Sequence, residues 1–295
     1  TARYALCTGD IAVMEMASAS GFELVSAADR DLLHSSTEGT GQLLRHAAQA
    51  SGARKILIGI GGSATNDGGT GMARALGYHF LDTAGHNLRP LPADLLELNR
   101  IEAPDDLALP PIEVACDVDN PLLGPNGATA IYGPQKGATP DLEKELEARL
   151  AHLVAITGAN EQALVPGAGA AGGLGFGLLH FAHASLRPGF DIVADALNLR
   201  ERLARADLVI TGEGSIDAQT LSGKGPAGIA RLAKEAGKPT LALAGHIALE
   251  VKEAGLFDHH ASLSEIGLPL ETLMAEAAPL LTRRTREALD ELSRC

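Results

Sequence analysis

The length, composition and charge of the chain limit what it can be. Its 295 residues are enough for one large or two ordinary domains, and 45% hydrophobic with 21% charged residues is a globular composition. The net charge of −13 argues against nucleic acid or an anionic membrane as a partner, because both bind basic surfaces. The three cysteines (Cys7, Cys116 and Cys295) lie far apart, which indicates neither zinc nor disulfides. Without a long apolar run or a signal peptide, we expect a soluble protein of the reducing cytoplasm.

The first segments of the chain show an alternation of strands and helices. A strand is expected at Ile11–Met16 and a short helix or loop at Ala17–Leu24. The apolar period then predicts a helix at Gln42–Ala50, which Gly52 closes. The strand Ile56–Ile58 follows directly, so this part of the chain has the order typical of a parallel sheet.

A glycine-rich loop after this strand is the most informative part of the sequence. Residues 59–71 contain six glycines and lead into a helix at Met72–Gly77. A strand, a loop of this kind and a helix present backbone N–H groups to an anion. The loop therefore predicts a phosphate or carboxylate site in preference to a structural turn. Its candidate contact residues are Gly61, Gly62, Ser63, Thr65, Asn66 and Asp67, although the Asp67 carboxylate could instead cap the following helix.

The middle of the chain changes character. In residues 81–136 the helical period is interrupted by prolines, among them Pro90, Pro92, Pro104, Pro110 and Pro111. Strands are expected at Ile112–Ala115 and Thr129–Tyr132. A helix with an apolar stripe should begin at Pro140, with Thr139 as its N-cap. Because α/β segments flank this proline-rich region, the sequence predicts an inserted second domain.

The last third returns to an α/β pattern. A strand at Asp207–Ile210 should end in the loop Thr211–Asp217, and a helix is expected at Pro226–Ala236. Further strands are expected at Pro239–Gly245 and Asp258–Leu263. The chain should close with a long helix, from about residue 271 to 294, that breaks at Pro279.

Two polar clusters in the middle of the chain could carry chemistry. The segment 115–121 places Asp117, Asp119 and Asn120 after a strand, where they could ligate Mg²⁺ or orient a hydroxyl, or simply form a turn. The segment 132–138 contains Gln135 and Lys136, and a lysine near glycines can bind phosphate or carboxylate. A surface turn is the alternative interpretation of that lysine.

Two glycine-containing clusters lie further along the chain. Glu213 and Asp217 follow a strand, where they could hold a metal or act as a base, and Lys224 could meet a phosphate. The segment 167–175 contains a Gly-x-Gly-x-x-Gly pattern, but no strand precedes it. We therefore interpret it as close helix packing, or as a loop against the second domain, in preference to a dinucleotide site.

Five of these segments together resemble the bacterial type-1 glycerate kinases. They occur in the family's order, and the similarity spans nearly all of residues 5–265. The segments are Gly61–Gly69, Ala115–Leu122, Gly133–Ala138, Gly167–Gly175 and Asp207–Thr220. The resemblance implies ATP-dependent phosphorylation of D-glycerate by two α/β domains that face a cleft.

The fold that the resemblance implies is α/β, with a Rossmann-like parallel-sheet domain and an inserted mixed-sheet domain. We expect residues 36–80 and 198–295 in the first, and residues 1–35 and 81–197 in the second. The cofactors implied are ATP and Mg²⁺, and the partners are D-glycerate and ATP, with a homodimer as a further expectation. Proteins of this family begin several tens of residues earlier, so we expect a fragment that lacks two strands and exposes a sheet edge.

The resemblance also suggests roles for individual residues. Lys136 and Lys224 would neutralise carboxylate or phosphate charge, since phosphoryl transfer depends on positioning and charge neutralisation. Asp119, Glu213 and Asp217 are the candidates for Mg²⁺ ligation and for orienting the attacking hydroxyl. The remaining expected binding residues, besides those of the first loop, are Asn120, Gln135 and Thr220.

Several alternatives stay open from the sequence. The 2-hydroxyl is the expected site of phosphorylation, but the 3-hydroxyl is the other choice. A non-catalytic sensor of a small carboxylate and a dinucleotide-dependent oxidoreductase are the rival functions. The segment Gly245–Ala248 departs from the family pattern, because His246 stands where the sequence Ser-Leu-Gly is expected.

Overall fold

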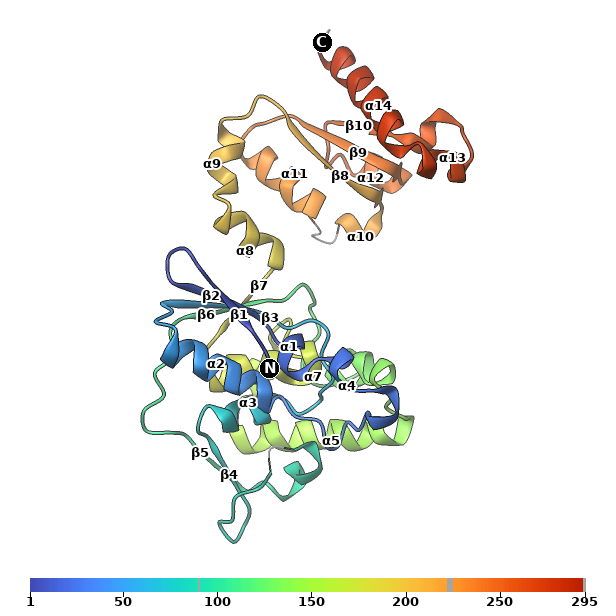
Figure 1. The fold of residues 1–295 in the computed structure, drawn as a ribbon. Helices are drawn as coiled ribbons and strands as arrows, with labels where there is room; N and C mark the ends of the chain where they lie inside the picture. The colour runs from blue at the N-terminus through green and yellow to red at the C-terminus, as the bar shows by residue number, and fades with distance from the viewer. Residues whose placement is uncertain (90, 222–224, 294–295) are drawn as a thin grey trace. The chain divides into compact units, whose positions relative to one another are not determined.

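The computed structural model describes residues 1–89, 91–221 and 225–293, and its internal contacts divide the chain into two units. Unit 1 is Thr1–Gly189 and unit 2 is Phe190–Cys295. Both combine parallel strands with helices (Figure 1), so the predicted α/β class is confirmed. None of the helices within these described ranges is long and apolar enough to cross a membrane.

The centre of unit 1 is a five-stranded sheet with the order β1-β2-β3-β6-β7, in which only β1 runs antiparallel to its neighbour. Burial alternates along the central strands, so Met14, Ile58 and Val114 lie in the core. Figure 1 shows the helices of this unit gathered below the strands in that view. The strands are β1 (Tyr4–Cys7), β2 (Ile11–Glu15), β3 (Lys55–Gly59), β6 (Ile112–Ala115) and β7 (Ser185–Arg187), and a separate hairpin is formed by β4 (His79–Leu81) and β5 (Arg100–Glu102).

The described part of unit 1 contains seven α-helices. They are α1 (Ala17–Ser20), α2 (Glu38–Ala50), α3 (Thr70–Ala75), α4 (Ala128–Tyr132), α5 (Pro140–Thr157), α6 (Asn160–Leu164) and α7 (Ala170–Phe181). The predicted start of α5 is confirmed, because the Thr139 side chain accepts a hydrogen bond from the Leu142 N–H at 3.3 Å. Its predicted apolar stripe is buried at Leu146, Leu150 and Leu153.

Glycines let the loop after β3 and helix α7 touch each other through their backbones. A Cβ on Gly172 would lie 1.9 Å from the Thr65 carbonyl oxygen, and one on Gly177 would lie 2.7 Å from the Gly69 Cα. No side chain fits at such distances, so only glycine allows this approach. The interpretation of the glycine cluster at 167–175 as close helix packing is thereby confirmed.

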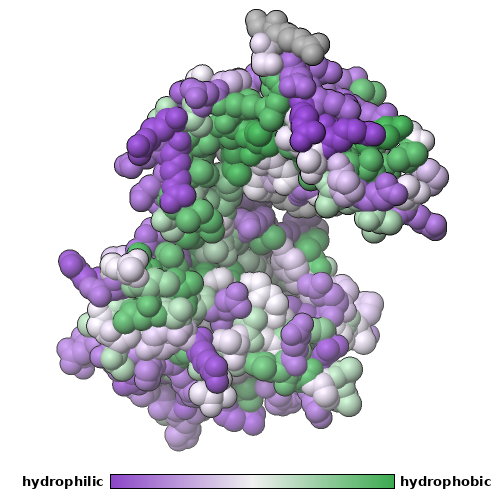
Figure 2. All heavy atoms as spheres, turned by 45° about the horizontal axis from the view of Figure 1, so that its top comes forward, coloured by the Kyte–Doolittle hydropathy of each residue, from purple (hydrophilic) through white to green (hydrophobic). Residues whose placement is uncertain are grey.

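Unit 2 is built around a three-stranded parallel sheet with the order β10-β9-β8. This order leaves β8 at an edge of the sheet. The face drawn in Figure 2 carries many hydrophilic side chains interspersed with hydrophobic ones. Leu280 of the C-terminal helix is buried. The elements are α8 (Gly189–Ala196), α9 (Leu199–Ala204), β8 (Val209–Ile216), α10 (Ala218–Leu221), α11 (Gly225–Glu235), β9 (Thr240–Ile247), α12 (Leu249–Glu253), β10 (His259–Ser262), α13 (Leu270–Ala275) and α14 (Ala277–Leu292).

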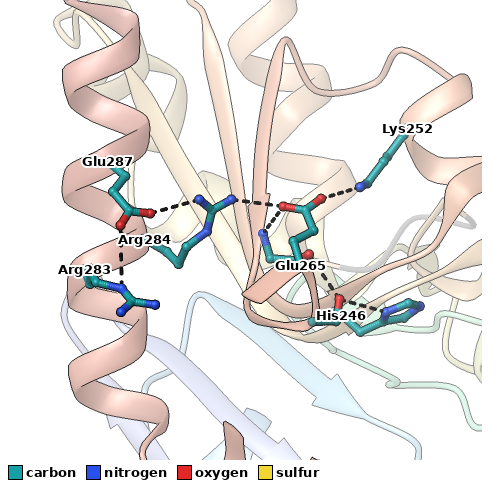
Figure 3. Close-up of polar contacts among 8 residues, drawn as sticks. His246, Lys252, Glu265, Arg283, Arg284 and Glu287 are labelled. Atoms are coloured by element: carbon teal, nitrogen blue, oxygen red, sulfur yellow. Dashed lines mark hydrogen bonds and ion pairs between the residues drawn. The ribbon is translucent and has the colours of Figure 1, made fainter. Parts of the chain in front are cut away.

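An ion-pair network fixes α14 and α12 to the end of β10 (Figure 3). The Glu265 carboxylate accepts hydrogen bonds from Lys252 Nζ at 2.5 Å and from Arg284 at 3.0 Å, and Arg284 also pairs with Glu287. Burial opposes ionisation of Glu265, but the Lys252 and backbone hydrogen bonds and the neighbouring positive charges outweigh it, so its pKa lies below the ordinary value. On the other side, His246 Nδ1 lies 3.2 Å from the Ser264 hydroxyl. This network stabilises the carboxyl edge of the unit 2 sheet.

The division of the chain differs from the one that the sequence suggested. We expected residues 36–80 to fold with residues 198–295, but β3 of that segment pairs with β2 on one side and β6 on the other. Residues 1–35, 36–80 and 81–189 therefore share one sheet and one core in unit 1. The pairing partner of a strand is a long-range property that local patterns do not show.

Three local predictions were wrong. Residues 129–132, expected as a strand, form helix α4, because this short segment packs between α5 and α7 with Ala128 and Thr129 buried. Residues 211–216, expected as a loop, continue β8 and pair with β9. This pairing needs glycine at position 212, because a Cβ on Gly212 would lie 1.9 Å from the carbonyl oxygen of Leu243 in β9.

The third wrong prediction concerns the closing helix, which divides at Glu276 and not at Pro279. Pro279 instead lies in the first turn of α14. A proline is tolerated there because the N–H groups of a first turn have no acceptor within the helix.

Candidate functional site

A cavity of about 500 Å³ lies in unit 1 next to the carboxyl ends of β3 and β6. Parallel sheets usually place their ligands at this edge. Five separate segments of the chain form its wall, and all of them belong to unit 1. The lining residues are Phe22, Ile60, Gly61, Gly62, Ser63, Ala115, Cys116, Asp117, Val118, Tyr132, Gln135, Lys136, Ala170 and Ala171.

The loop after β3 forms one wall of this cavity and is fixed from behind. The Phe22 N–H donates to the Gly62 carbonyl at 2.8 Å, and the Ala64 N–H donates to the Ser20 carbonyl at 3.1 Å. The N–H groups of Gly61, Gly62 and Ser63, in contrast, donate no hydrogen bond to any residue that the structure describes. Gly62 takes a φ of +70°, which glycine adopts readily. Successive free N–H groups in such a loop are suited to bind an anion.

Lys136 contributes a buried positive charge to the same wall. Its side chain is only 5% exposed, and its Nζ donates to Ser63 Oγ at 2.6 Å and to the Thr65 carbonyl at 2.8 Å. No carboxylate of the described chain lies within ion-pair distance of it. Burial lowers the pKa of Lys136 to about 8, although the charge of Asp67 opposes this shift. A buried cation without an anionic partner indicates that the cavity binds an anion.

Asp67 has the hydrogen bonds of a structural residue. Its carboxylate is fully buried and accepts from the Thr37 N–H and hydroxyl, both at 2.8 Å, and from the N–H groups of Gly69 and Gly71. Burial raises the pKa of Asp67, and these four hydrogen bonds offset part of the rise. Asp67 does not line the cavity. The geometry matches the second of its two suggested roles, which is to hold the start of the following helix.

Thr65 and Asn66 lie behind the wall and not in the cavity. Both side chains are almost completely buried, and Asn66 Nδ2 donates to the Thr129 hydroxyl at 3.0 Å. Thr65 Oγ1 and Asn66 Oδ1 have no hydrogen-bond partner within the described ranges. Thr65 reaches the site through its backbone, because its carbonyl holds the Lys136 ammonium.

The acidic cluster after β6 contributes Asp117 to the cavity and not Asp119. Asp117 lines the cavity, and its Oδ1 accepts a hydrogen bond from the Gly189 N–H at 2.7 Å. Asp119 is exposed and outside the lining. Asn120 also lies outside the lining, and its side-chain oxygen accepts a hydrogen bond from the Tyr132 hydroxyl at 2.6 Å. Of the two carboxylates that the sequence offered in this cluster, Asp117 is therefore the one that reaches the cavity.

Two further wall residues were absent from the candidates that the sequence gave. Phe22 comes from a segment far away in the sequence, and the guanidinium of Arg30 lies 3.6 Å from its ring centre. Cys116 lies directly after β6, and burial raises the pKa of its thiol, which disfavours the reactive thiolate. The sequence could have suggested Cys116 as a wall residue only through its position directly after a strand of the sheet. No local feature of the sequence indicates that Phe22 lines the cavity.

The remaining candidates lie in unit 2. The Thr220 hydroxyl donates to the Glu213 carboxylate and accepts from the Asp217 N–H at 3.3 Å, so these three residues form one group at the carboxyl end of β8. Lys224 lies outside the described residues. Across the ranges that the structure describes, no three Asp, Glu, His or Cys side chains form a group that could hold a metal.

A larger cavity of about 1180 Å³ also lies in unit 2, between β8, β9 and the last two helices. Its wall is mostly apolar, with Leu243, Leu273 and Leu281 among its residues, and Glu213 and His246 at its polar part. It has no lysine or arginine in its lining. The cavity of unit 1 is therefore the better candidate for a small anion.

Asp67→Asn should destabilise the fold without removing the anion site. The carboxylate now accepts four hydrogen bonds, from Thr37, Gly69 and Gly71. An amide in its place would turn an NH₂ group or a weaker acceptor toward these donors, which should lower the free energy of unfolding by about 2–4 kcal/mol. Urea unfolding measures this cost, and Asp141→Asn on the exposed start of α5 is the matched control. Loss of anion binding at unchanged stability would contradict this role and place Asp67 in the binding site.

Comparison with known proteins identifies the family. The Glycerate kinase family profile matches residues 1–293. The chain is 44% identical to the glycerate kinase of Bacillus subtilis over 95% of this chain and 75% of that protein. It is 47% identical to the glycerate 2-kinase of Escherichia coli over 82% of this chain and 65% of that protein.

A solved structure agrees with this result. The crystal structure of a Salmonella typhimurium LT2 protein assigned as glycerate kinase 2 superposes with a TM-score of 0.75, at 44% identity, over 88% of this chain and 70% of that one. The chain thus spans between 65% and 75% of the length of these relatives. It belongs to the glycerate kinase family, and the prediction of a glycerate kinase from its motifs is confirmed.

Proposed function

We propose that the unit 1 cavity binds D-glycerate and that the protein transfers a phosphoryl group from ATP to its 2-hydroxyl. The observation that carries this proposal is the buried Lys136 ammonium, which has no carboxylate partner among the described residues. The name of the Escherichia coli relative, glycerate 2-kinase, supports the choice of hydroxyl. Activity in the cytoplasm and a homodimer remain predictions from the sequence.

The polarity of the wall matches a small hydroxy acid. The carboxylate of glycerate would accept hydrogen bonds from the free N–H groups of Gly61 and Gly62 and face the Lys136 charge. The Ser63 hydroxyl accepts from Lys136, so its own hydrogen is free to donate to the ligand. A cavity of about 500 Å³ holds a three-carbon acid with room for the transferred group.

Asp117 is the candidate group for the substrate hydroxyl. Its side chain lines the cavity, and the Gly189 N–H holds one carboxylate oxygen, which leaves the other available. In the reaction the hydroxyl oxygen would bond to the γ-phosphorus while the bond from phosphorus to the β-phosphate oxygen breaks. The hydroxyl proton would pass to Asp117, and ADP would leave.

Glu213 and Asp217 are the proposed ligands of Mg²⁺. Mg²⁺ usually takes one or two protein carboxylates and completes its shell with phosphate oxygens and water. Glu213 in the last part of β8 and Asp217 directly after it fit that need. The ion would supply neutralisation of the ATP phosphate charge. Lys224, which was expected to meet a phosphate, stays a prediction.

The direct test is phosphorus NMR of D-glycerate with Mg-ATP and the protein. The expected product is a phosphomonoester whose signal couples to one proton, because the 2-carbon carries one hydrogen. Coupling to two protons would identify the 3-hydroxyl as the acceptor. If glycerate binds while ATP remains unchanged, the carboxylate sensor replaces the kinase.

A pair of variants distinguishes the two neighbouring carboxylates. If Asp117 receives the proton, Asp117→Asn should lower kcat by about 10²–10⁴-fold, whereas Asp119→Asn should retain most of the activity. The two substitutions change the same chemistry two residues apart, so each controls for the other. The reverse ranking in steady-state assays would return the role to Asp119, as the sequence suggested.

The binding of glycerate should weaken at alkaline pH. The pKa of Lys136 is about 8, so the charged form that binds a carboxylate is complete below this pH and is lost above it. The Kd for glycerate, measured by calorimetry, should be constant below pH 7 and rise up to about tenfold per unit well above pH 8. Lys136→Met should bind weakly at every pH, and Lys144→Met, an exposed lysine of α5, is the control. A Kd independent of pH up to pH 10 would exclude the role of Lys136.

A further inference from the structure

The hydroxyl group of Tyr132 lies at the wall of the unit 1 cavity but gives its proton to a residue behind the wall. Tyr132 lines the cavity, and Asn120 does not. The Tyr132 hydroxyl donates to Asn120 Oδ1 at 2.6 Å. A tyrosine hydroxyl has one hydrogen and also accepts through its lone pairs, so only the lone pairs are left for a ligand.

The direction of this hydrogen bond is set by the other half of the Asn120 amide. Asn120 Nδ2 donates to the Asn126 carbonyl oxygen at 2.8 Å. A carbonyl can only accept, so the amide turns its NH₂ group toward Asn126 and its oxygen toward Tyr132. The Asn120 backbone is held as well, because its carbonyl accepts from the Gly169 N–H at 2.9 Å. Asn120 therefore fixes the direction in which the Tyr132 proton points.

The surroundings of Tyr132 keep this hydroxyl protonated. Burial raises the pKa of Tyr132 above its ordinary value, and the negative charge of an ionised Cys116 adds to the rise. Cys116 lines the same cavity, so the hydroxyl end of Tyr132 is close to another group of that wall. At neutral pH Tyr132 therefore presents an uncharged acceptor to the cavity.

The cavity wall thus has a donating part and an accepting part. The donating part consists of the free N–H groups of the loop after β3 and the Lys136 ammonium. The accepting part consists of the Asp117 carboxylate and the Tyr132 hydroxyl. Among the described side chains of the lining, these are the two oxygen-bearing groups that have no hydrogen left to donate. A ligand that matches this wall has one anionic group and two hydroxyl groups.

We propose that Tyr132 determines the specificity for a second hydroxyl group on the acceptor acid, and that Asn120 is the residue that positions Tyr132 for this role. This inference rests on the proposed assignment of glycerate to this cavity, in which Asp117 faces the reacting hydroxyl. The 3-hydroxyl then donates to the Tyr132 oxygen. An acid with a methyl group at the 3-carbon leaves this oxygen without a donor, and an acid with a second carboxylate there brings two acceptors together.

Three acids that differ only at the 3-carbon test this assignment. D-Glycerate has a hydroxymethyl group there, D-lactate has a methyl group, and hydroxymalonate has a carboxylate. Calorimetry would measure the Kd of each acid on the wild type, on Tyr132→Phe and on Asn120→Leu. Tyr78→Phe is the matched control, because the Tyr78 hydroxyl donates to the Phe181 carbonyl at 2.9 Å and lies outside the cavity lining.

The wild type should bind D-glycerate about tenfold or more tightly than either of the other two acids, as expected for one hydrogen bond gained or lost. Tyr132→Phe should reduce the preference over D-lactate to less than about threefold and change the Kd of D-lactate itself by less than about twofold. Tyr78→Phe should keep the preference of the wild type. Equal affinities of the wild type for D-lactate and D-glycerate, or a Tyr132→Phe variant with the full preference, would overturn the proposal.

Asn120→Leu separates positioning from a merely structural role. Leucine cannot accept the Tyr132 proton, so the hydroxyl becomes free to donate, and hydroxymalonate should gain about tenfold in affinity relative to D-glycerate. Weakening of all three acids by the same factor would overturn the role of Asn120.

The wild type and Tyr132→Phe decide the role of Tyr132 even if Asn120→Leu does not fold. The two proposals also fail separately. If D-glycerate binds without any preference over D-lactate, this inference is wrong and the proposed function stands. If none of the three acids binds to the wild type, both are wrong.

Discussion

The arrangement of unit 1 depends on a buried ammonium group that is held by neutral oxygens. Lys136 donates to one hydroxyl and one carbonyl of the loop after β3, and these contacts replace only part of the hydration that burial removes. A carboxylate beside it would complete the compensation, but the nearest fully buried one, Asp67, uses its oxygens on Thr37 and on the start of α3. The positive charge of Lys136 therefore remains partly uncompensated, and an anionic ligand in the cavity that Lys136 lines would compensate it.

Glycine packing makes this geometry rigid. The loop after β3 and the start of α7 touch through backbone atoms at Gly172 and Thr65 and again at Gly69 and Gly177, so neither segment can move without the other. Close-packed backbones of this kind leave few alternative arrangements. The free N–H groups of the loop after β3 are consequently preorganised, which lowers the entropy that a ligand must lose on binding. The left-handed conformation of Ala171 is maintained by these contacts, because nothing in an alanine favours it.

The parts of the site that the sequence predicted are those with a local signal. A strand followed by glycines identified the β3 loop, and the turn around Lys136 stood out in an acidic chain. Local signals failed where pairing decided the outcome: β3 joined the sheet of β2 and β6, and residues 211–216 extended β8. They also could not rank Asp117 above Asp119, since two residues of identical chemistry differ only in the direction that the chain takes after β6.

The acidic composition of the chain is compatible with an anion site because most of the donors are backbone groups. A net charge of −13 creates a field that repels an acid such as glycerate at long range, but salt screens that field within about 10 Å. At contact distance the fixed N–H groups of the glycine-rich loop after β3 and one buried ammonium determine the potential. Backbone N–H groups do not titrate in the range where proteins are studied, so we expect any pH dependence of anion binding to come from Lys136, whose pKa is about 8. Glycines, and not a cluster of basic residues, are therefore the sequence signal of this site, and composition alone would have pointed away from it.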